Sequence, residues 1–389
     1  MAPFVSTKKA TRLCITADRD NFDSSFLRSW SLEGFDVRYL PLVKDKKAFI
    51  HDLEGVKTGL SVSESYAIIS VSPYPFNNAA LILSGFGEAA AVCLEHFLHS
   101  PNTSKLCALI AYYPTRIIDP ELAYPSSVRV LIHFAAQDVT VVYPSTGRAH
   151  KSQREVRRIT SAMGTGDRLS VGYQAYVYSG SLPGFAEKDM KQYNHIPAQL
   201  AWSRSLKALQ LAFHREVDLE AVWDEAQQAR YFSSKPGSSI GCYTGDETPS
   251  VTFQPTAQGA SGGTDLRRFY ENNFGGNAPT SMRLRLLSRT TGADRVVEEL
   301  YMSFKHSQEM PWILPGVAPT HKQVEVILIS ITRFIGGKIS SENVYWDQAS
   351  VLCQVGLIDP GLVPQGVQGV QRIPVTGREE ARTVLSGST

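Results

Sequence analysis

The first two hundred residues alternate short apolar runs with amphipathic segments. The apolar runs lack a regular polar alternation, and the segments between them have helical spacing. Continuous apolar strands separated by helices are typical of a parallel sheet covered on both faces, so we predict an α/β fold. The predicted strands are 11–17, 35–42, 65–70, 80–85, 106–114, 128–136 and 172–178, and the predicted helices are 26–34, 88–98 and 198–216.

The second half of the chain has a different pattern. A predicted helix, 219–232, is followed by a segment rich in Gly, Ser, Thr and Pro, 233–263, in which we expect loop and one short strand. A further helix and long strands without intervening helices then predict an antiparallel α+β domain. Gly336 and Gly337 suit a primed hairpin turn between the last two strands. The later helix is 264–274 and the strands are 282–291, 294–306, 323–335 and 338–347. We therefore expect two domains, 1–213 and 214–389.

Composition narrows the classes of partner. The chain has 389 residues, 43% of them hydrophobic, and a net charge of +2. This near-neutral charge gives no electrostatic basis for binding nucleic acid or a membrane surface. No apolar stretch has the length of a signal peptide core or a membrane span, so we expect a cytoplasmic protein. The basic segment 147–158 is predicted to be a solvated loop and the start of a helix.

Cysteine usage gives a negative prediction. The five cysteines are scattered and form no C-x-x-C pair; they are Cys14, Cys93, Cys107, Cys242 and Cys353. We expect neither a disulfide framework nor a zinc site, and no metal elsewhere.

The stretch LILSGFGEAAAV (81–92) is typical of a strand that turns sharply into a helix. With HFAAQD and SLPGF further along, it resembles the dienelactone hydrolase family, in which a nucleophile, an Asp and a His form a triad. The resemblance puts Gly87 at the nucleophile, Asp138 at the acid and Pro183 at the histidine. Because the members of a triad act together, we expect this domain to be catalytically inactive. Cys93 lies too far along the helix to replace the nucleophile, and a buried structural thiol is expected there.

The strand 296–306 predicts a pocket wall. With a period of two, Glu298 and His306 share a face with Leu300, Met302 and Phe304, while Glu299 lies on the other face unless a bulge exchanges the two glutamates. The alternative for His306 is a hydrogen-bonded core histidine.

The segment SENVYWDQ (341–348) carries a second candidate acid. Asn343, Tyr345 and Asp347 share one face, and Glu342, Val344 and Trp346 share the other. Aromatic neighbours would desolvate Asp347 and suit it to general acid–base work. Asp347 could equally be the N-cap of the helix predicted to follow. Trp312 and Trp346 are expected in the core or the pocket wall.

The residues 310–360, with MPWILPG and ENVYWDQ, are similar to the SnoaL-like polyketide cyclases of the NTF2-like superfamily, and the whole chain resembles fused hydrolase-like and SnoaL-like proteins. This resemblance implies a conical α+β domain with a curved antiparallel sheet, no cofactor, and an acid–base role for Asp347 with His306 beside it. Tyr345 or Glu299 would then act as donor or relay. The similar proteins tend to have histidine where this chain has Phe253 and Asn343, which implies a pocket altered for another substrate.

Three functions stay open at this point. The first is a cyclase or isomerase acting on a small polyketide-like or lactone substrate, in secondary metabolism. The second is a lactone or ester hydrolase, and the third is a non-catalytic binding or scaffold protein. Either a monomer or a homodimer is compatible with the sequence. The sequence predicts Glu298, Tyr345, Trp346, Trp312, Asn343 and Phe253 as substrate contacts.

Overall fold

The computed structural model divides the chain into two compact units, Met1–Glu216 and Val217–Thr389. Each unit has its own cluster of buried apolar side chains. The structure describes residues 11–42, 45–72, 89–99, 103–118, 123–135, 138–142, 154–158, 165–168, 172–274, 278–363 and 366–387. The predicted strand 80–85 therefore lies outside the described residues.

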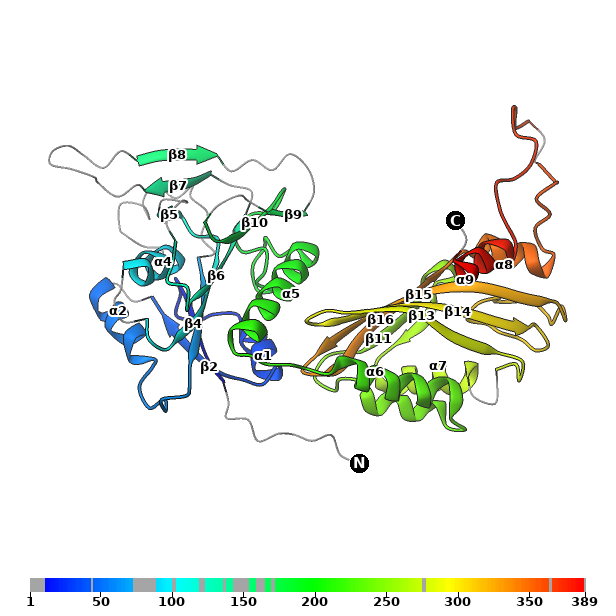
Figure 1. Ribbon diagram of the computed structural model, residues 1–389, viewed down its shortest axis with the longest axis horizontal. Helices are drawn as coiled ribbons and strands as arrows, with labels where there is room; N and C mark the ends of the chain where they lie inside the picture. Colours follow the sequence, from blue (N-terminus) through cyan, green and yellow to red (C-terminus); the bar gives the residue numbers. More distant parts are fainter. Residues whose placement is uncertain are drawn as a thin grey trace. The chain divides into compact units, whose positions relative to one another are not determined.

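A seven-stranded sheet forms the centre of the first unit, in the order β2-β1-β3-β4-β6-β10-β9 (Figure 1). All neighbours pair in parallel except the edge strand β9, which runs antiparallel to β10. The parallel α/β arrangement predicted from the apolar runs is confirmed. The strands are β1 (Thr11–Ala17), β2 (Phe35–Pro41), β3 (Tyr66–Val71), β4 (Leu106–Tyr112), β6 (Arg129–Ala135), β9 (Thr165–Arg168) and β10 (Gln174–Tyr178).

Helices cover both faces of this sheet. On one face α1 (Ser24–Leu32) packs beside α5 (His195–Ala212), with the rings of Trp30 and Trp202 only 4.0 Å apart. On the other face lie α2 (Lys46–Gly55) and α4 (Ala89–His99), whose apolar side chains join the central cluster (Figure 1). Both faces of the sheet are therefore shielded from solvent, which explains the continuous apolar sequence of its strands.

A second, three-stranded sheet lies in the same unit. Its order is β5-β7-β8, from β5 (Arg116–Ile118), β7 (Asp138–Val142) and β8 (Arg154–Arg158). The prediction of a loop and helix start for the basic segment is wrong for 154–158. These residues form a strand because they pair antiparallel with β7.

The second unit contains a six-stranded sheet in the order β12-β11-β16-β15-β14-β13. Its neighbours are antiparallel except β11 and β16, which pair in parallel. The long strands predicted from the sequence are present, and 250–261 adds two short strands where one was expected. The strands are β11 (Ser250–Phe253), β12 (Gln258–Ser261), β13 (Arg283–Thr291), β14 (Arg295–Lys305), β15 (Gln323–Ile335) and β16 (Lys338–Trp346).

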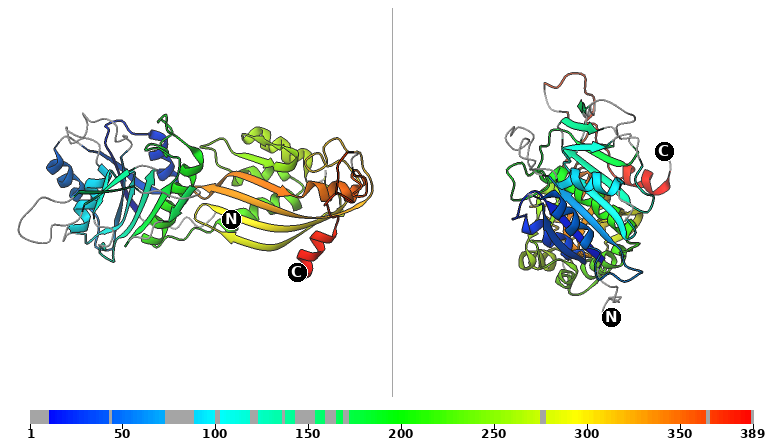
Figure 2. Two further views of the ribbon diagram at one scale, coloured as in Figure 1. Left: turned by 90° about the horizontal axis from the view of Figure 1, so that it is seen from above. Right: turned by 90° about the vertical axis from the view of Figure 1, so that its left-hand side faces the viewer.

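Helical segments cover one face of this sheet, and two further helices lie at its other side near one end (Figures 1 and 2). The covering layer is built from α6 (Leu219–Gln227), a π-helical turn η1 (Gln228–Phe232), 3₁₀ turns η2 (Pro236–Cys242) and η3 (Gln254–Thr256), and α7 (Gly263–Asn273). The other two helices are α8 (Gln348–Val355) and α9 (Glu379–Ser386), both of which contact β15.

The β15–β16 hairpin sets which residues of β16 face the core. Gly336 and Gly337 have φ of 57° and 73°, so the two-residue turn needs glycine's freedom at positive φ, as predicted. A β-bulge between Arg333 and Phe334 lies just before this turn and shifts the register. Beyond the bulge the pairing continues regularly from Arg333–Ser341 to Leu328–Trp346.

Among the residues that the structure describes, no helix is long and apolar enough to cross a membrane.

Candidate functional site

The buried face of β14 carries the residues expected of a pocket wall. Glu298, Leu300, Met302 and Phe304 alternate with less buried neighbours, and His306 continues the same face. Gln227 of α6 donates a hydrogen bond to Glu298, so this face is the one that the helical layer covers. Glu299 lies on the opposite face and accepts a hydrogen bond from Ser288 at 3.3 Å. The catalytic placement expected for Glu299 needs correction, because no bulge in β14 turns it inward.

The two faces of β16 differ in burial. Glu342, Val344 and Trp346 are buried against the helical layer, whereas Asn343 is only partly buried and Tyr345 is 41% exposed. The Oδ1 atom of Asn343 accepts a hydrogen bond from Gln254 at 2.8 Å. The expected pocket positions of Asn343 and Tyr345 therefore need correction, because the register of the hairpin turns the other set of side chains inward.

Asp347 occupies the capping position that the sequence left as an alternative. Its carboxylate is exposed, and its Oδ1 atom accepts a hydrogen bond from the Ala349 backbone N–H at 2.9 Å at the start of α8. Such a cap satisfies a helix N–H that has no partner within the helix. The desolvated environment expected for Asp347 is absent.

Strand register also separates Asp347 from His306. Trp346 pairs with Leu328, and Leu328 pairs with Leu300, so the next step along the sheet brings Asp347 level with Tyr301. His306 lies five residues beyond Tyr301, directly after the end of β14. At ~3.3 Å per residue this is roughly 16 Å, too far for both groups to act on one atom.

His306 is fully buried near the end of the wall. Its Nδ1 atom accepts a hydrogen bond from the Thr320 backbone N–H at 3.2 Å, while its Nε2 atom has no hydrogen-bond partner among the described residues. Burial, and next the charge of His321, lower the pKa of His306. The ring is therefore neutral at pH 7, with its proton on Nε2.

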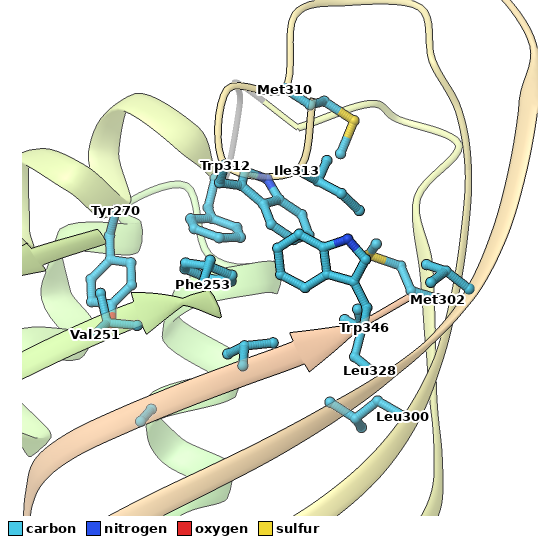
Figure 3. Close-up of a cluster of buried hydrophobic side chains, with 14 of the residues drawn as sticks. Val251, Phe253, Tyr270, Leu300, Met302, Met310, Trp312, Ile313, Leu328 and Trp346 are labelled. Carbon is cyan, nitrogen blue, oxygen red and sulfur yellow. The ribbon is translucent and has the colours of Figure 1, made fainter. Parts of the chain in front are cut away.

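Three aromatic side chains form the middle of the interior (Figure 3). Phe253 of β11 lies with its ring centroid 5.0 Å from that of Trp312 and 6.1 Å from that of Trp346, and all three are buried. Gln348 holds the group in place, since it accepts from the Trp346 indole N–H at 2.6 Å and donates to the Ile313 carbonyl at 2.9 Å. We refer to Phe253, Trp312 and Trp346 as the aromatic floor.

A polar cluster lies next to the aromatic floor. Arg230 of η1 donates two hydrogen bonds to Glu342, at 2.9 and 2.7 Å, and its Nη2 atom also reaches the hydroxyl groups of Tyr243 at 2.9 Å and Tyr270 at 3.1 Å. The two hydroxyl oxygens are 2.5 Å apart. Glu342 pairs in register with Val251, two residues before Phe253, which places the cluster one step from the floor. We refer to Arg230, Tyr243, Tyr270 and Glu342 as the polar cluster.

Within the polar cluster, the surroundings keep Arg230 charged and the two tyrosines neutral. Burial alone would lower the pKa of Arg230, but the Glu342 carboxylate and the tyrosine hydroxyls raise it well above its ordinary value. Burial raises the pKa of Tyr243 and of Tyr270, although the Arg230 charge opposes this. Both tyrosines are therefore neutral hydroxyl donors at pH 7, beside a permanent positive charge.

Glu298 belongs to a second ion-pair group. The Nε atom of Arg289 donates to it at 2.7 Å, and Arg289 also contacts Asp224 of α6 at 2.6 Å. These contacts fasten α6 to the sheet, so Glu298 has a positioning role in the fold.

Sequence reasoning missed Arg230 and Glu342. A signal for Arg230 was present, because it continues the apolar stripe of Leu219, Trp223 and Ala226 at helical spacing, where a charge needs a partner. For Glu342, the only sequence feature that pointed to a buried position was its alternation with Val344 and Trp346.

In the first unit, none of the described side chains at the three triad positions is a catalytic group. Gly87 and the side chain of Asp138 lie outside the described residues, and Pro183 is buried. Cys93 is buried, and desolvation raises the pKa of its thiol to about 12, which suits a structural thiol. Within the described ranges, no three His, Cys, Asp or Glu side chains come together as metal ligands.

No protein-family model and no curated protein matches the chain. Solved structures with partial likeness include AclR, a candidate hydroxylase from Streptomyces galilaeus, at 20% identity and a TM-score of 0.29 over 38% of this chain and 89% of that one. A candidate SnoaL-like polyketide cyclase from Jannaschia sp. CCS1 is 14% identical, with a TM-score of 0.28 over 41% and 94%. A protein with a ketosteroid isomerase-like fold from Catenulispora acidiphila, in complex with trimethylamine, is 15% identical, with a TM-score of 0.27 over 38% and 98%. At these TM-scores the likenesses carry no argument about activity.

Proposed function

We propose that the C-terminal unit is a cofactor-free cyclase or isomerase that acts on a small polyketide-like or lactone substrate by general acid–base chemistry. Such reactions start with enolisation next to a carbonyl group. Enolisation needs a base near the C–H bond and hydrogen-bond donors for the enolate oxygen as its charge develops. The N-terminal unit, in this proposal, is an inactive hydrolase-like domain.

The observation that supports this function is the hydroxyl pair of Tyr243 and Tyr270 beside Arg230. One hydroxyl of the pair donates to the other, and the second O–H remains free to donate. Such a donor next to a permanent positive charge is suited to a developing enolate oxygen, because the dipoles are already oriented when the charge appears. Burial strengthens these interactions by excluding water.

The other roles follow from position. The aromatic floor lies one step from the polar cluster, so it would bind the apolar ring of the substrate while the carbonyl oxygen points to the tyrosines. Glu342 is the acidic group of the cluster and is our candidate for the base. Asp347 and His306, implied by the resemblance, are the competing assignment.

Deuterium exchange tests the proposal without knowledge of the natural substrate. The full chain is incubated in D₂O with 1-tetralone, an aromatic ketone, and with dihydrocoumarin, an aromatic lactone, and the loss of the α-proton is followed by NMR. We expect catalysed exchange in the wild type. Tyr270→Phe and Tyr243→Phe should each reduce it by about a hundredfold, as for the loss of one oxyanion donor.

Tyr345→Phe is the matched control, since Tyr345 lies on the partly exposed face. Exchange that survives in both interior Tyr→Phe variants but is lost in Asp347→Asn would contradict the proposal and favour the competing assignment. Ring opening of dihydrocoumarin without exchange would favour the hydrolase.

A non-catalytic binding protein is the second candidate. It is favoured by Phe253 and Asn343 standing where similar proteins tend to have histidine, and by the exposed, capping position of Asp347. Quenching of tryptophan fluorescence by 1-tetralone without any proton exchange would support it.

A further inference from the structure

The first unit contains a buried acidic side chain without hydrogen bonds. Glu187 lies on the loop 179–194 that joins β10 to α5 (Figure 1), and it is 0% exposed. Neither of its carboxyl oxygens has a hydrogen-bond partner in the part of the chain that the structure describes. A buried carboxyl in this state has lost its hydration without compensation, which is uncommon in folded proteins.

The nearest cation only partly compensates for this loss. The Nη2 atom of Arg19 lies 3.6 Å from Oε2 of Glu187. Arg19 donates instead to both oxygens of Asp189, at 2.7 and 2.9 Å, in a bidentate pair. The guanidinium group is therefore oriented toward Asp189, and Glu187 is left with a long contact.

The charges around Glu187 disfavour its ionised form. Burial raises the pKa of Glu187 to about 8; Arg19 and, to a smaller extent, the nearby Tyr113 hydroxyl oppose the shift, while Asp189 and Asp23 add to it. The other titratable groups that face it are Tyr113, Tyr112 and Tyr39, and burial raises the pKa of each. Glu187 is therefore largely protonated at pH 7 unless another positive charge approaches.

The loop holds Glu187 in a fixed position. The hydroxyl of Tyr113 accepts a hydrogen bond from the Ala186 backbone N–H at 2.8 Å, and its ring packs against Phe185 at 4.9 Å. On the other side, the Lys188 backbone N–H donates to Asp23 at 2.6 Å. Tyr113 itself has a φ of 53°, a strained backbone angle for a bulky residue and a common feature of functional sites.

These groups meet where α/β sheets bind ligands. Arg19 follows β1, Tyr113 follows β4 and Glu187 follows β10, so all three come from the carboxyl ends of parallel strands. The direction of the strand order reverses between β1 and β3, and ligands of such sheets bind outside the carboxyl ends at this reversal, so Arg19 lies beside it. Tyr113 and Glu187 follow strands further along the same edge.

We propose that Glu187 is the anchoring carboxylate of a second small-molecule site, which takes a ligand carrying a protonated amine or guanidinium group. Asp23 and Asp189 add negative charge near Glu187, which disfavours an anionic ligand. A cationic nitrogen supplies two N–H donors for the two carboxyl oxygens, and its charge favours the ionised carboxylate. The site is independent of the function proposed for the C-terminal unit.

The test uses the full chain, isothermal calorimetry and two probes, methylguanidinium and n-butylammonium, with n-butanol and butyrate as uncharged and anionic counterparts. We expect only the two cations to bind. Because the carboxyl must lose its proton first, methylguanidinium should bind about tenfold more tightly at pH 9 than at pH 7. At pH 7 the heat should vary with the buffer, since nearly one proton is released.

Two variants make the test specific. Glu187→Gln should weaken cation binding at least tenfold and remove its dependence on pH, whereas the exposed Glu216→Gln should change neither. Asp189→Asn leaves Glu187 intact but frees Arg19 to pair with it, so it should also weaken binding. Cation binding that is unchanged in Glu187→Gln, equal binding of butanol, or no binding of either cation at pH 9 would overturn the proposal.

Discussion

Arg230 and Glu342 form a bidentate ion pair in the interior of the C-terminal unit. The two N–O distances are 2.9 and 2.7 Å, and the side chains are 0% and 1% exposed. Arg230 comes from the helical layer and Glu342 from the sheet, so the pair joins the two layers of the unit. Burying both charges is costly, and removal of either partner leaves the other without compensation.

Single replacement of either partner should therefore destabilise the second unit strongly. We expect Arg230→Met or Glu342→Leu to lower the free energy of unfolding by about 3–5 kcal/mol, and the double variant to recover most of the loss. Urea titration of the full chain, followed by tryptophan fluorescence, measures this. The exposed pair of Arg268 and Asp265 is the control, since its loss should cost under about 1 kcal/mol. Additive losses in the double variant would contradict the expected coupling.

Asp347 should act as a helix cap. We expect Asp347→Ala to lower stability by about 1 kcal/mol, and Asp347→Asn to leave stability and α-proton exchange nearly unchanged, because Asn caps as well as Asp. Thermal unfolding and the exchange assay measure the two effects. A hundredfold loss of exchange in Asp347→Asn at normal stability would restore the catalytic role implied by the resemblance.

In the first unit, His133 should contribute a loss of stability in mild acid, which Glu187 opposes because its raised pKa favours the folded chain as the pH falls. Burial, and next the charge of Arg204, lower the pKa of His133 well below its ordinary value. Below about pH 6.5 the unfolded chain binds a proton on this imidazole and the folded chain does not, so the contribution of His133 to stability falls by up to about 1.4 kcal/mol per pH unit. The difference in unfolding free energy between the wild type and His133→Gln, measured by urea titration, should therefore shift against the wild type as the pH falls from about 6.5 to about 5.

The glycine turn of the β15–β16 hairpin should tolerate no other residue well. Gly337 has a φ of 73°, so Gly337→Ala should cost about 1–2 kcal/mol although nothing lies within 4 Å of the added methyl group. Gly55→Ala in α2 is the matched control, since Gly55 has no positive φ and equal space around it. It should be neutral or stabilising by up to about 1 kcal/mol. Equal losses in the two variants would show that the turn conformation is not the cause.

Thiol labelling should separate the cysteines by burial. Desolvation raises the pKa of Cys14 and of Cys93 to about 12, and both are buried. We expect iodoacetamide at pH 8 to leave both unmodified in the folded chain, while partly exposed Cys353 reacts. Peptide mass spectrometry measures this, with labelling in urea as the control. Rapid native labelling of Cys93 would indicate an activated thiol.

The secondary structure followed from the sequence because the strands of the first unit are strongly apolar and separated by clear helices. The buried face of β14 was predictable for a similar reason, since Leu300, Met302 and Phe304 mark one face. On β16 each face carries one acid and one aromatic residue, so the alternation alone did not show which face is buried. Only the pairing with β15 decides this, and local sequence does not encode it.

The β-bulge between Arg333 and Phe334 has a consequence for how this domain could change. The bulge offsets the pairing of β15 with β16 by one residue, and this offset determines which face of β16 is exposed to solvent. An insertion or deletion at the hairpin would turn Asn343, Tyr345 and Asp347 inward and expel Glu342 and Trp346. The strand therefore carries two alternative sets of side chains for the same interior, and a change of one residue in length, without any substitution, would exchange one set for the other.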